Sequence, residues 1–127
     1  MTKALVIVPT YNEADNIINI IKSVLSLSLD FNILVVDDNS PDKTGFLVKS
    51  IALKNTERVF LLSRDNKDGL GKAYTDGFNW ALKNKYDYIF EMDADFSHDP
   101  NDLVRIYKEL FISNFDVVIG SRYINGI

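Results

Sequence analysis

The chain has 127 residues, of which 46% are hydrophobic and 25% are charged, so we expect one soluble globular domain with a single core. Its net charge of −4 and the lack of a Lys/Arg cluster argue against nucleic acid as a partner. The absence of cysteine excludes disulfides, thiolate catalysis and cysteine-based zinc sites, and a single histidine, His98, excludes sites built from several histidines.

Short apolar runs alternate with longer segments of helical period, which predicts an α/β fold with a mostly parallel sheet and helices on both faces. In chain order we expect a strand at Ala4–Val8 ended by Pro9, a helix from Glu13 to about Leu27, a strand at Asn32–Val36, a loop from Asp37 to about Lys43, a helix from Thr44 to about Leu53, a strand at Arg58–Leu62, a polar segment at Ser63–Leu70, a helix from Gly71 to about Lys83, a strand at Tyr86–Glu91, a helix at Pro100–Ile112 and a strand at Phe115–Ile119.

The lengths of the apolar runs allow a prediction of the cellular location. Ala4–Val8 is shorter than the apolar region of a signal peptide, and no run reaches the roughly 18 apolar residues of a membrane-spanning helix. We therefore expect a cytoplasmic protein, for which peripheral contact with the cytoplasmic membrane face stays open.

The polar motifs fall at the predicted carboxyl ends of the strands, which is where ligands bind in open α/β sheets. Asp93-Ala94-Asp95 is the most informative of them, because two carboxylates so close together repel each other unless a cation lies against them. Mg²⁺ and Mn²⁺ prefer such oxygen ligands and share them with substrate phosphates. Ser97 is placed to join this metal shell directly or through water. The other interpretation is that the acids cap a helix, for which Asp99-Pro100 is the clearer candidate.

Two further motifs suggest nucleoside recognition, each with a structural alternative. Tyr11 offers a ring on which a base can stack, and Glu13 can accept hydrogen bonds, although the same segment can cap a helix. Asp37 can accept the NH groups of a base, whereas Asp38 or Asn39 can simply start a turn.

Three other features are weaker. Gly69-Leu70-Gly71-Lys72 lacks the full spacing of a P-loop, so we expect a close-packed turn, with Arg64 and Lys72 available to phosphates. His98 can orient a ligand or be a loop residue with a satisfied hydrogen bond. Arg122 is a planar donor suited to phosphate recognition, or an ordinary surface arginine.

Together these motifs resemble the inverting GT-A glycosyltransferases of family 2, and most closely the polyprenol-phosphate sugar transferases that include the dolichol-phosphate mannosyltransferases. The resemblance spans the whole chain and is carried by the segments Val8–Glu13, Val35–Asp42, Gly69–Tyr74, Met92–His98 and Gly120–Tyr123. It implies a Rossmann-like GT-A fold of which this chain is the N-terminal, donor-binding portion.

The resemblance also implies a role for each site residue. Pro9, Tyr11, Glu13, Val35 and Asp37 would hold the nucleoside. Asp93 and Asp95 would bind Mg²⁺ or Mn²⁺ on the diphosphate and act in catalysis together with Arg122, which lies near the phosphates. Ala94 would pack against the nucleotide. Ser97 is a third metal ligand by this pattern, although some relatives carry glutamine there.

The implied reaction is metal-dependent transfer of a sugar, with GDP-mannose as the expected donor, to a polyprenol or dolichol phosphate at a membrane surface. The metal stabilises charge on the leaving diphosphate, and a lipid phosphate is already an oxyanion that needs no general base. Displacement at the anomeric carbon would invert its configuration.

Relatives of this kind continue for roughly another hundred residues, as the family pattern implies, so we expect residues 1–127 to be one nucleotide-sugar-binding domain that is truncated at its C-terminus. Two alternatives keep the fold: a transferase that uses UDP-glucose or another donor and acceptor, and a catalytically silent nucleotide-sugar-binding fragment. A receiver domain has a similar size, but its acid pair, phosphorylated Asp and Lys are missing from the places that hold Pro9-Thr10-Tyr11, Ser63-Arg64 and Gly120-Ser121-Arg122.

Overall fold

The structure, a computed structural model, describes residues 3–65 and 69–113, with the side chains of 111–113 left out. The predicted last strand, Phe115–Ile119, and the predicted site residue Arg122 lie outside the described residues. The elements are β1 (Ala4–Thr10), α1 (Ile17–Leu25), β2 (Phe31–Asp37), α2 (Thr44–Lys54), β3 (Val59–Ser63), α3 (Leu70–Lys83), β4 (Tyr88–Glu91) and α4 (Asp102–Ser113).

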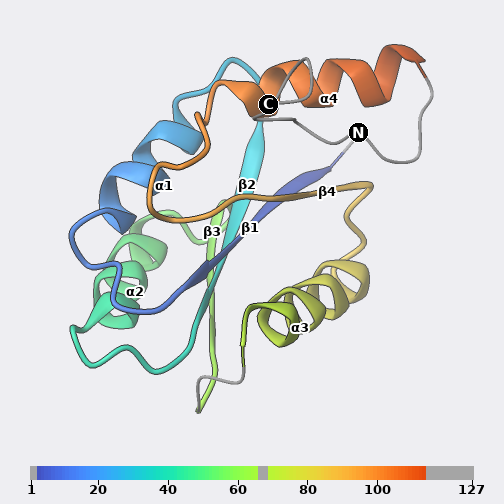
Figure 1. Cartoon of the computed structure of the whole chain (residues 1–127). Coiled ribbons are helices and arrows are strands. Elements are labelled where there is room, and N and C mark those ends of the chain that lie inside the picture. The colour runs from blue at the N-terminus through green and yellow to red at the C-terminus, as the bar shows by residue number, and fades with distance from the viewer. Residues whose placement is uncertain (1–2, 66–68, 114–127) are drawn as a thin grey trace, which may run out of the picture.

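The four strands form one sheet in the order β3-β2-β1-β4, and every neighbouring pair is parallel (Figure 1). The predicted α/β fold with a parallel sheet is thus confirmed. Because all strands run the same way, their carboxyl ends meet at one edge, where Thr10 of β1 pairs with Asp37 of β2 and Asp37 pairs with Ser63 of β3.

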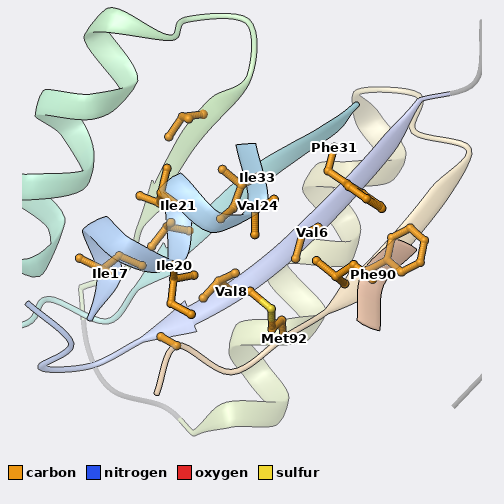
Figure 2. Packing of buried hydrophobic residues seen from close by; sticks show 14 of the residues in the cluster. Val6, Val8, Ile17, Ile20, Ile21, Val24, Phe31, Ile33, Phe90 and Met92 are labelled. Atoms are coloured by element: carbon orange, nitrogen blue, oxygen red, sulfur yellow. The ribbon is translucent and has the colours of Figure 1, made fainter. Parts of the chain in front are cut away.

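Helices cover both faces of the sheet, as predicted. Along β1, Val6 and Val8 face the core under α1, α2 and α4, while Leu5 and Ile7 face α3. This alternation follows from the two-residue period of a strand, and it explains why β1 is apolar throughout. Figure 2 shows the first core, in which Val8 lies beside Met92 and the side chains of α1.

α1 forms because its apolar residues recur at helical spacing. Ile17, Ile20, Ile21 and Val24 are each 0% exposed and face the sheet. Each such side chain contributes about 1.5–3 kcal/mol on full burial. α3 approaches the other face more closely, since a Cβ added at Gly77 would lie 2.8 Å from Cγ2 of Ile7.

β1 does not end at Pro9, as the sequence had suggested, but continues to Thr10. Successive residues of a parallel strand direct their backbone groups to opposite neighbours. Thr10 bonds toward β2, where its carbonyl accepts from the Asp38 N–H, so Pro9 faces the β4 side. The β1–β4 pairing already ends at Ile7 and Glu91, and the missing N–H of Pro9 therefore costs no ladder bond.

Three other boundaries differ from prediction for local reasons. α1 begins at Ile17 rather than Glu13, because the chain turns at Asn12, which has a φ of 56°. β4 begins at Tyr88, since the Tyr86 N–H donates to the Ala81 carbonyl at the end of α3. α4 begins at Asp102, after the turn that Asp99 makes. Among residues 3–65 and 69–113, no helix is long and apolar enough to cross a membrane.

Candidate active site

Most of the predicted site residues that the structure describes lie at the carboxyl edge of the sheet. Residues 10–14 end and follow β1, residues 37–44 end and follow β2, and residues 91–98 end and follow β4. We call the first two segments the clasp, because they hold each other, and the third the acidic loop.

Asp37 is the centre of the clasp. Its side chain is buried at 4% exposure, and Oδ1 accepts hydrogen bonds from the hydroxyls of Thr10 at 2.8 Å and Ser40 at 2.6 Å. Oδ2 accepts one from the Ser40 N–H at 3.1 Å. A carboxylate offers about four acceptor positions, so protein donors occupy most of them and a position on Oδ2 remains for a ligand. Gly45 keeps that oxygen accessible, because a Cβ there would lie 3.0 Å from it.

Side chains after β2 also accept the backbone N–H groups after β1. The Asn12 N–H donates to the Ser40 hydroxyl at 2.9 Å and the Glu13 N–H to the Thr44 hydroxyl at 3.0 Å. The Ala14 N–H donates to Oδ2 of Asp42 at 3.0 Å. Ser40 and Asp42 thus join the two loops.

Asp42 itself is held by several donors. Burial acts to raise the pKa of its carboxyl, but hydrogen bonds from the Thr44 hydroxyl and from the N–H groups of Ala14 and Thr44 outweigh burial and leave the pKa below its usual value. The bond from the Thr44 N–H, at 3.0 Å, spans two residues and forms the turn into α2.

Asp38 is neutralised within the protein. Its Oδ1 lies 3.4 Å from Nε of Arg64, and the same nitrogen lies 3.5 Å from Oδ2 of Asp76. The Arg64 side chain is only 8% exposed. Arg64 was expected to be available to phosphates, but the structure places it between two carboxylates instead.

The acidic loop brings Asp93, Asp95 and Ser97 together. The Ser97 hydroxyl donates to Oδ2 of Asp93 at 3.4 Å, and the Ser97 N–H donates to Oδ1 of Asp95 at 2.9 Å. Ser97 therefore touches both carboxylates. The other Asp93 oxygen, Oδ1, accepts from the Tyr74 hydroxyl of α3 at 3.4 Å.

The backbone of the acidic loop is strained next to these carboxylates. Phe96 has a φ of 61°, a left-handed conformation that is costly for a bulky residue, and its side chain is 43% exposed. The turn closed by Asp95 and the Ser97 N–H holds it there. Such outliers cluster at functional sites, where the surrounding structure fixes them.

Charge and burial shift the proton affinities around Asp93. Burial, with the charge of Asp93, raises the pKa of Glu91. Burial also raises the pKa of Tyr74 far above its usual value, helped by the charges of Asp93 and Glu91. The pKa of Asp95 is lowered, chiefly by hydrogen bonds from Ser97. The loop thus concentrates negative charge that a cation would relieve.

The donor set fits Mg²⁺ or Mn²⁺ bound jointly with a diphosphate. Asp93, Asp95 and Ser97 provide only hard oxygen atoms, and Mg²⁺ typically takes one or two carboxylates and completes its shell with water and phosphate. Within residues 3–65 and 69–113, no group of three or more His, Cys, Asp or Glu side chains is arranged to hold a metal by itself. A metal bound at Asp93, Asp95 and Ser97 would complete its shell with water and substrate phosphate oxygens.

The remaining predicted nucleotide contacts differ in exposure. Tyr11 is 37% exposed and Glu13 half-buried, so both can meet a ligand. Pro9 is half-buried. Val35 is 0% exposed and Ala94 4% exposed, and both pack in the core under α1, α2 and α4. The side chain of Val35 therefore lies below the edge rather than on it.

His98 and the glycine turn have structural partners. Nδ1 of His98 accepts the Asp93 N–H at 3.4 Å, which matches the interpretation of a satisfied loop histidine. Gly69, with a φ of 96°, is the N-cap of α3, and its carbonyl accepts the Ala73 N–H. A Cβ added at Gly69 or Gly71 would meet no atom within 4 Å, so the predicted close-packed turn is wrong. Asp99 forms the expected turn before α4, with Oδ1 accepting the Asn101 N–H at 3.0 Å.

Sequence reasoning missed three residues that touch this site: Gly45, Tyr74 and Glu91. Glu91 could have been found, since Glu91-x-Asp93-x-Asp95 places a third acid at alternate positions. Tyr74 comes from a distant helix, and only the folded structure brings its hydroxyl to Asp93.

An open groove of about 890 Å³ lies beside the acidic loop. Ser97 and His98 line one side of it, and Ser23 of α1 and Leu27, just after α1, line the other. Its lining includes none of the clasp residues. The groove therefore adjoins the acidic loop at Ser97 but does not reach Asp37 or Tyr11.

Comparison with known proteins identifies the family. The model of glycosyl transferase family 2 matches residues 5–127. The chain is 45% identical over 124 residues to the polyprenol monophosphomannose synthase of Mycolicibacterium smegmatis, covering 98% of this chain and 46% of that protein. It is 41% identical over 124 residues to the undecaprenyl-phosphate mannosyltransferase of Micrococcus luteus, covering 98% and 50%. The chain thus spans about half the length of these curated relatives.

Solved structures give the same answer for the fold. The mannosyltransferase PcManGT from Pyrobaculum calidifontis, in complex with GDP-Man and Mn²⁺, matches with a TM-score of 0.69 at 26% identity over 85% of this chain and 32% of that one. Residues 1–349 of TarS from S. aureus, in complex with UDP, match with a TM-score of 0.59 at 30% identity over 74% and 28%. The predicted GT-A-like fold is confirmed, and the chain belongs to glycosyl transferase family 2.

Proposed function

We propose that the protein transfers a mannosyl group from GDP-mannose to a polyprenol phosphate, with Mg²⁺ or Mn²⁺ bound between Asp93, Asp95, Ser97 and the donor diphosphate. The observation that carries this proposal is the arrangement of the acidic loop, in which Ser97 contacts both carboxylates beside the clasp. The names of the two curated relatives support the mannosyl group and the polyprenol phosphate. The ligands of PcManGT support the donor and the use of a divalent metal.

The nucleoside half of the donor would lie against the clasp. Tyr11 offers its exposed ring to the base, Glu13 accepts from hydroxyls or base edges, and Asp37 receives base NH groups at the remaining position on Oδ2. Pro9 shapes the end of β1. Val35 supports Asp37 from the core two residues before it, and Ala94 likewise supports the two neighbouring carboxylates from the core.

The acidic loop would then hold the diphosphate. A bound metal neutralises the charge that develops on the leaving diphosphate. Asp93 and Asp95 keep their carboxylates fixed through Tyr74 and Ser97, so they need little rearrangement on binding. Arg122 follows the predicted last strand, and its guanidinium is proposed as a further hydrogen-bond donor to the phosphates.

The acceptor phosphate would attack the anomeric carbon from the side opposite the diphosphate. One acceptor oxygen forms the new bond as the bond between the sugar and the diphosphate breaks, so the configuration inverts. A phosphate oxygen is already anionic near neutral pH and no side chain has to remove a proton.

Calorimetric titration with GDP-mannose and with UDP-glucose, each in Mn²⁺ and in EDTA, tests the donor and the metal together. We expect GDP-mannose to bind only with metal, and Asp95→Ala to remove most of this metal-dependent binding. Asp102→Ala, which removes an exposed acid at the start of α4, is the charge-matched control. Donor binding that is equal in Mn²⁺ and EDTA would contradict the metal assignment.

The second candidate is a transferase that uses a uridine nucleotide, and the 30% identical match to TarS in complex with UDP favours it specifically. Metal-dependent binding of UDP-glucose but not GDP-mannose in the same titration would select this alternative. Donor binding without sugar transfer to polyprenol phosphate would instead indicate the silent fragment.

A further inference from the structure

The outer face of α2 carries two large apolar side chains in water. Phe46 is 69% exposed and Leu53 is 72% exposed. They are seven residues apart on one helix, which places them on the same side two turns from each other. The inner side of α2 is already packed through Val48 against the sheet. Neither core therefore accounts for the outer pair.

Lysines flank this apolar pair. Lys49 and Lys54 lie to either side of it around the helix axis, and Lys43 precedes the first turn; all three are exposed. The helix contains no acid. Among the described residues none of the three lysines forms an ion pair, and the acids next to the helix are Asp42, which the clasp engages, and the exposed Glu57. On a chain of net charge −4, α2 is a local basic face.

We propose that this face of α2, formed by Phe46, Leu53, Lys43, Lys49 and Lys54, docks on an anionic membrane surface. Helices that bind at a membrane interface place apolar side chains at the boundary between headgroups and acyl chains. Lysines beside them extend their charged ends to lipid phosphates, and each contributes about a fivefold gain in binding to anionic lipid. The apolar centre and basic margins of α2 match both requirements.

Docking through α2 would also place the candidate active site close to the membrane. α2 begins at Thr44, whose hydroxyl accepts the Glu13 N–H in the clasp. Phe46 lies two residues farther on, so contact through α2 would bring the carboxyl edge of the sheet near the surface. This consequence rests on the proposed function, in which the acceptor is a lipid phosphate, whereas the docking itself requires only the α2 face.

Sedimentation of the full chain with lipid vesicles tests the proposal without any nucleotide sugar. We expect binding to vesicles of phosphatidylcholine with phosphatidylglycerol, and much weaker binding to phosphatidylcholine alone. Lys49→Gln with Lys54→Gln should weaken binding about 25-fold, at about fivefold for each charge. Phe46→Ser with Leu53→Ser should weaken it about tenfold for each side chain.

The matched controls lie on α3, on the opposite face of the sheet (Figure 1). Leu82 is 66% exposed, and the neighbouring Lys83 is exposed as well. Leu82→Ser with Lys83→Gln should leave vesicle binding unchanged, and circular dichroism should show all variants folded. Absence of binding to anionic vesicles, or equal losses in the α2 and α3 variants, would overturn the proposal.

Two further outcomes are also decisive. If Phe46→Ser with Leu53→Ser dissociates a dimer in the absence of vesicles, the face is a contact between copies and the membrane proposal fails. Vesicle binding is measured without donor, and donor binding without vesicles. Loss of one with the other intact therefore separates a failure of this proposal from a failure of the proposed function.

Discussion

In the clasp, protein donors as close as 2.6 Å occupy the buried carboxylate of Asp37, whereas in the acidic loop the side-chain contacts to Asp93 are 3.4 Å long. Both regions place two acids next to each other, or nearly so, at the end of a strand, and the sequence analysis assigned the first pair to nucleoside recognition or a turn and the second to a metal. The difference is how tightly protein donors hold each acid: three donors lie within 3.1 Å of the buried Asp37, whereas the hydroxyls that reach Asp93 stay 3.4 Å away and the charge of Glu91 lies near it. Carboxylates in the clasp therefore hold the edge together, and those in the acidic loop retain capacity for a cation.

The strongest test of this contrast compares stability. Asp37→Ala should lower the free energy of unfolding by about 3 kcal/mol, because it leaves the Thr10 and Ser40 hydroxyls and the Ser40 N–H without their buried acceptor. Asp95→Ala removes an exposed acid together with its hydrogen bond from the Ser97 N–H, and should lower the free energy of unfolding by only about 1 kcal/mol. Urea denaturation followed by circular dichroism measures both. Equal losses would show that the two regions do not differ as the hydrogen bonds indicate.

Ligand binding should reverse that ranking. Asp93→Asn keeps the shape of the side chain but removes a charge from the metal site, so donor affinity in Mn²⁺ should fall on the order of 100-fold. His98→Ala should cost much less, since His98 only accepts the Asp93 N–H at 3.4 Å. Calorimetry with GDP-mannose compares the two. A larger loss for His98→Ala would mean that the histidine, not the acid, dominates donor binding.

The fold and the edge that carries the site were predictable because both depend on local sequence. Apolar residues such as Ile17, Ile20 and Val24 repeat at helical spacing, and parallel strands bring their carboxyl ends to one edge whatever the loops do. What each acid does was less predictable. The partners of Asp38 and Asp93 come from Arg64 and Tyr74, which are distant in sequence and meet them only after packing.

The clasp should also depend on pH through Asp42. Its pKa is lowered from 3.8 in the folded protein, so its stabilising effect is present above that value and is lost as the pH falls through the folded pKa. Asp42→Asn should cost about 1 kcal/mol at neutral pH, and the cost should shrink in acid. Asp15→Asn, an exposed neighbour, is the control for the change of charge. A cost that stays constant down to low pH would show that geometry rather than ionisation holds the loops.

Glu91 should show the opposite sign in the acidic loop. Burial and the Asp93 charge raise its pKa above 4.5, so the folded state is favoured at low pH and loses that advantage as the pH rises through the folded pKa. Glu91→Gln should therefore stabilise the protein at neutral pH by about 0.3 kcal/mol, a small amount because solvent screens this exposed side chain. The gain should vanish below the ordinary pKa, where wild-type Glu91 is neutral as well.

Mn²⁺ with GDP-mannose offers a second check, because a cation at Asp93 would offset the same repulsion and reduce the difference in stability between wild type and variant. If Glu91→Gln instead destabilises the protein at neutral pH, the charge of Glu91 has a stabilising partner, and the acidic loop is balanced internally in the way the clasp is.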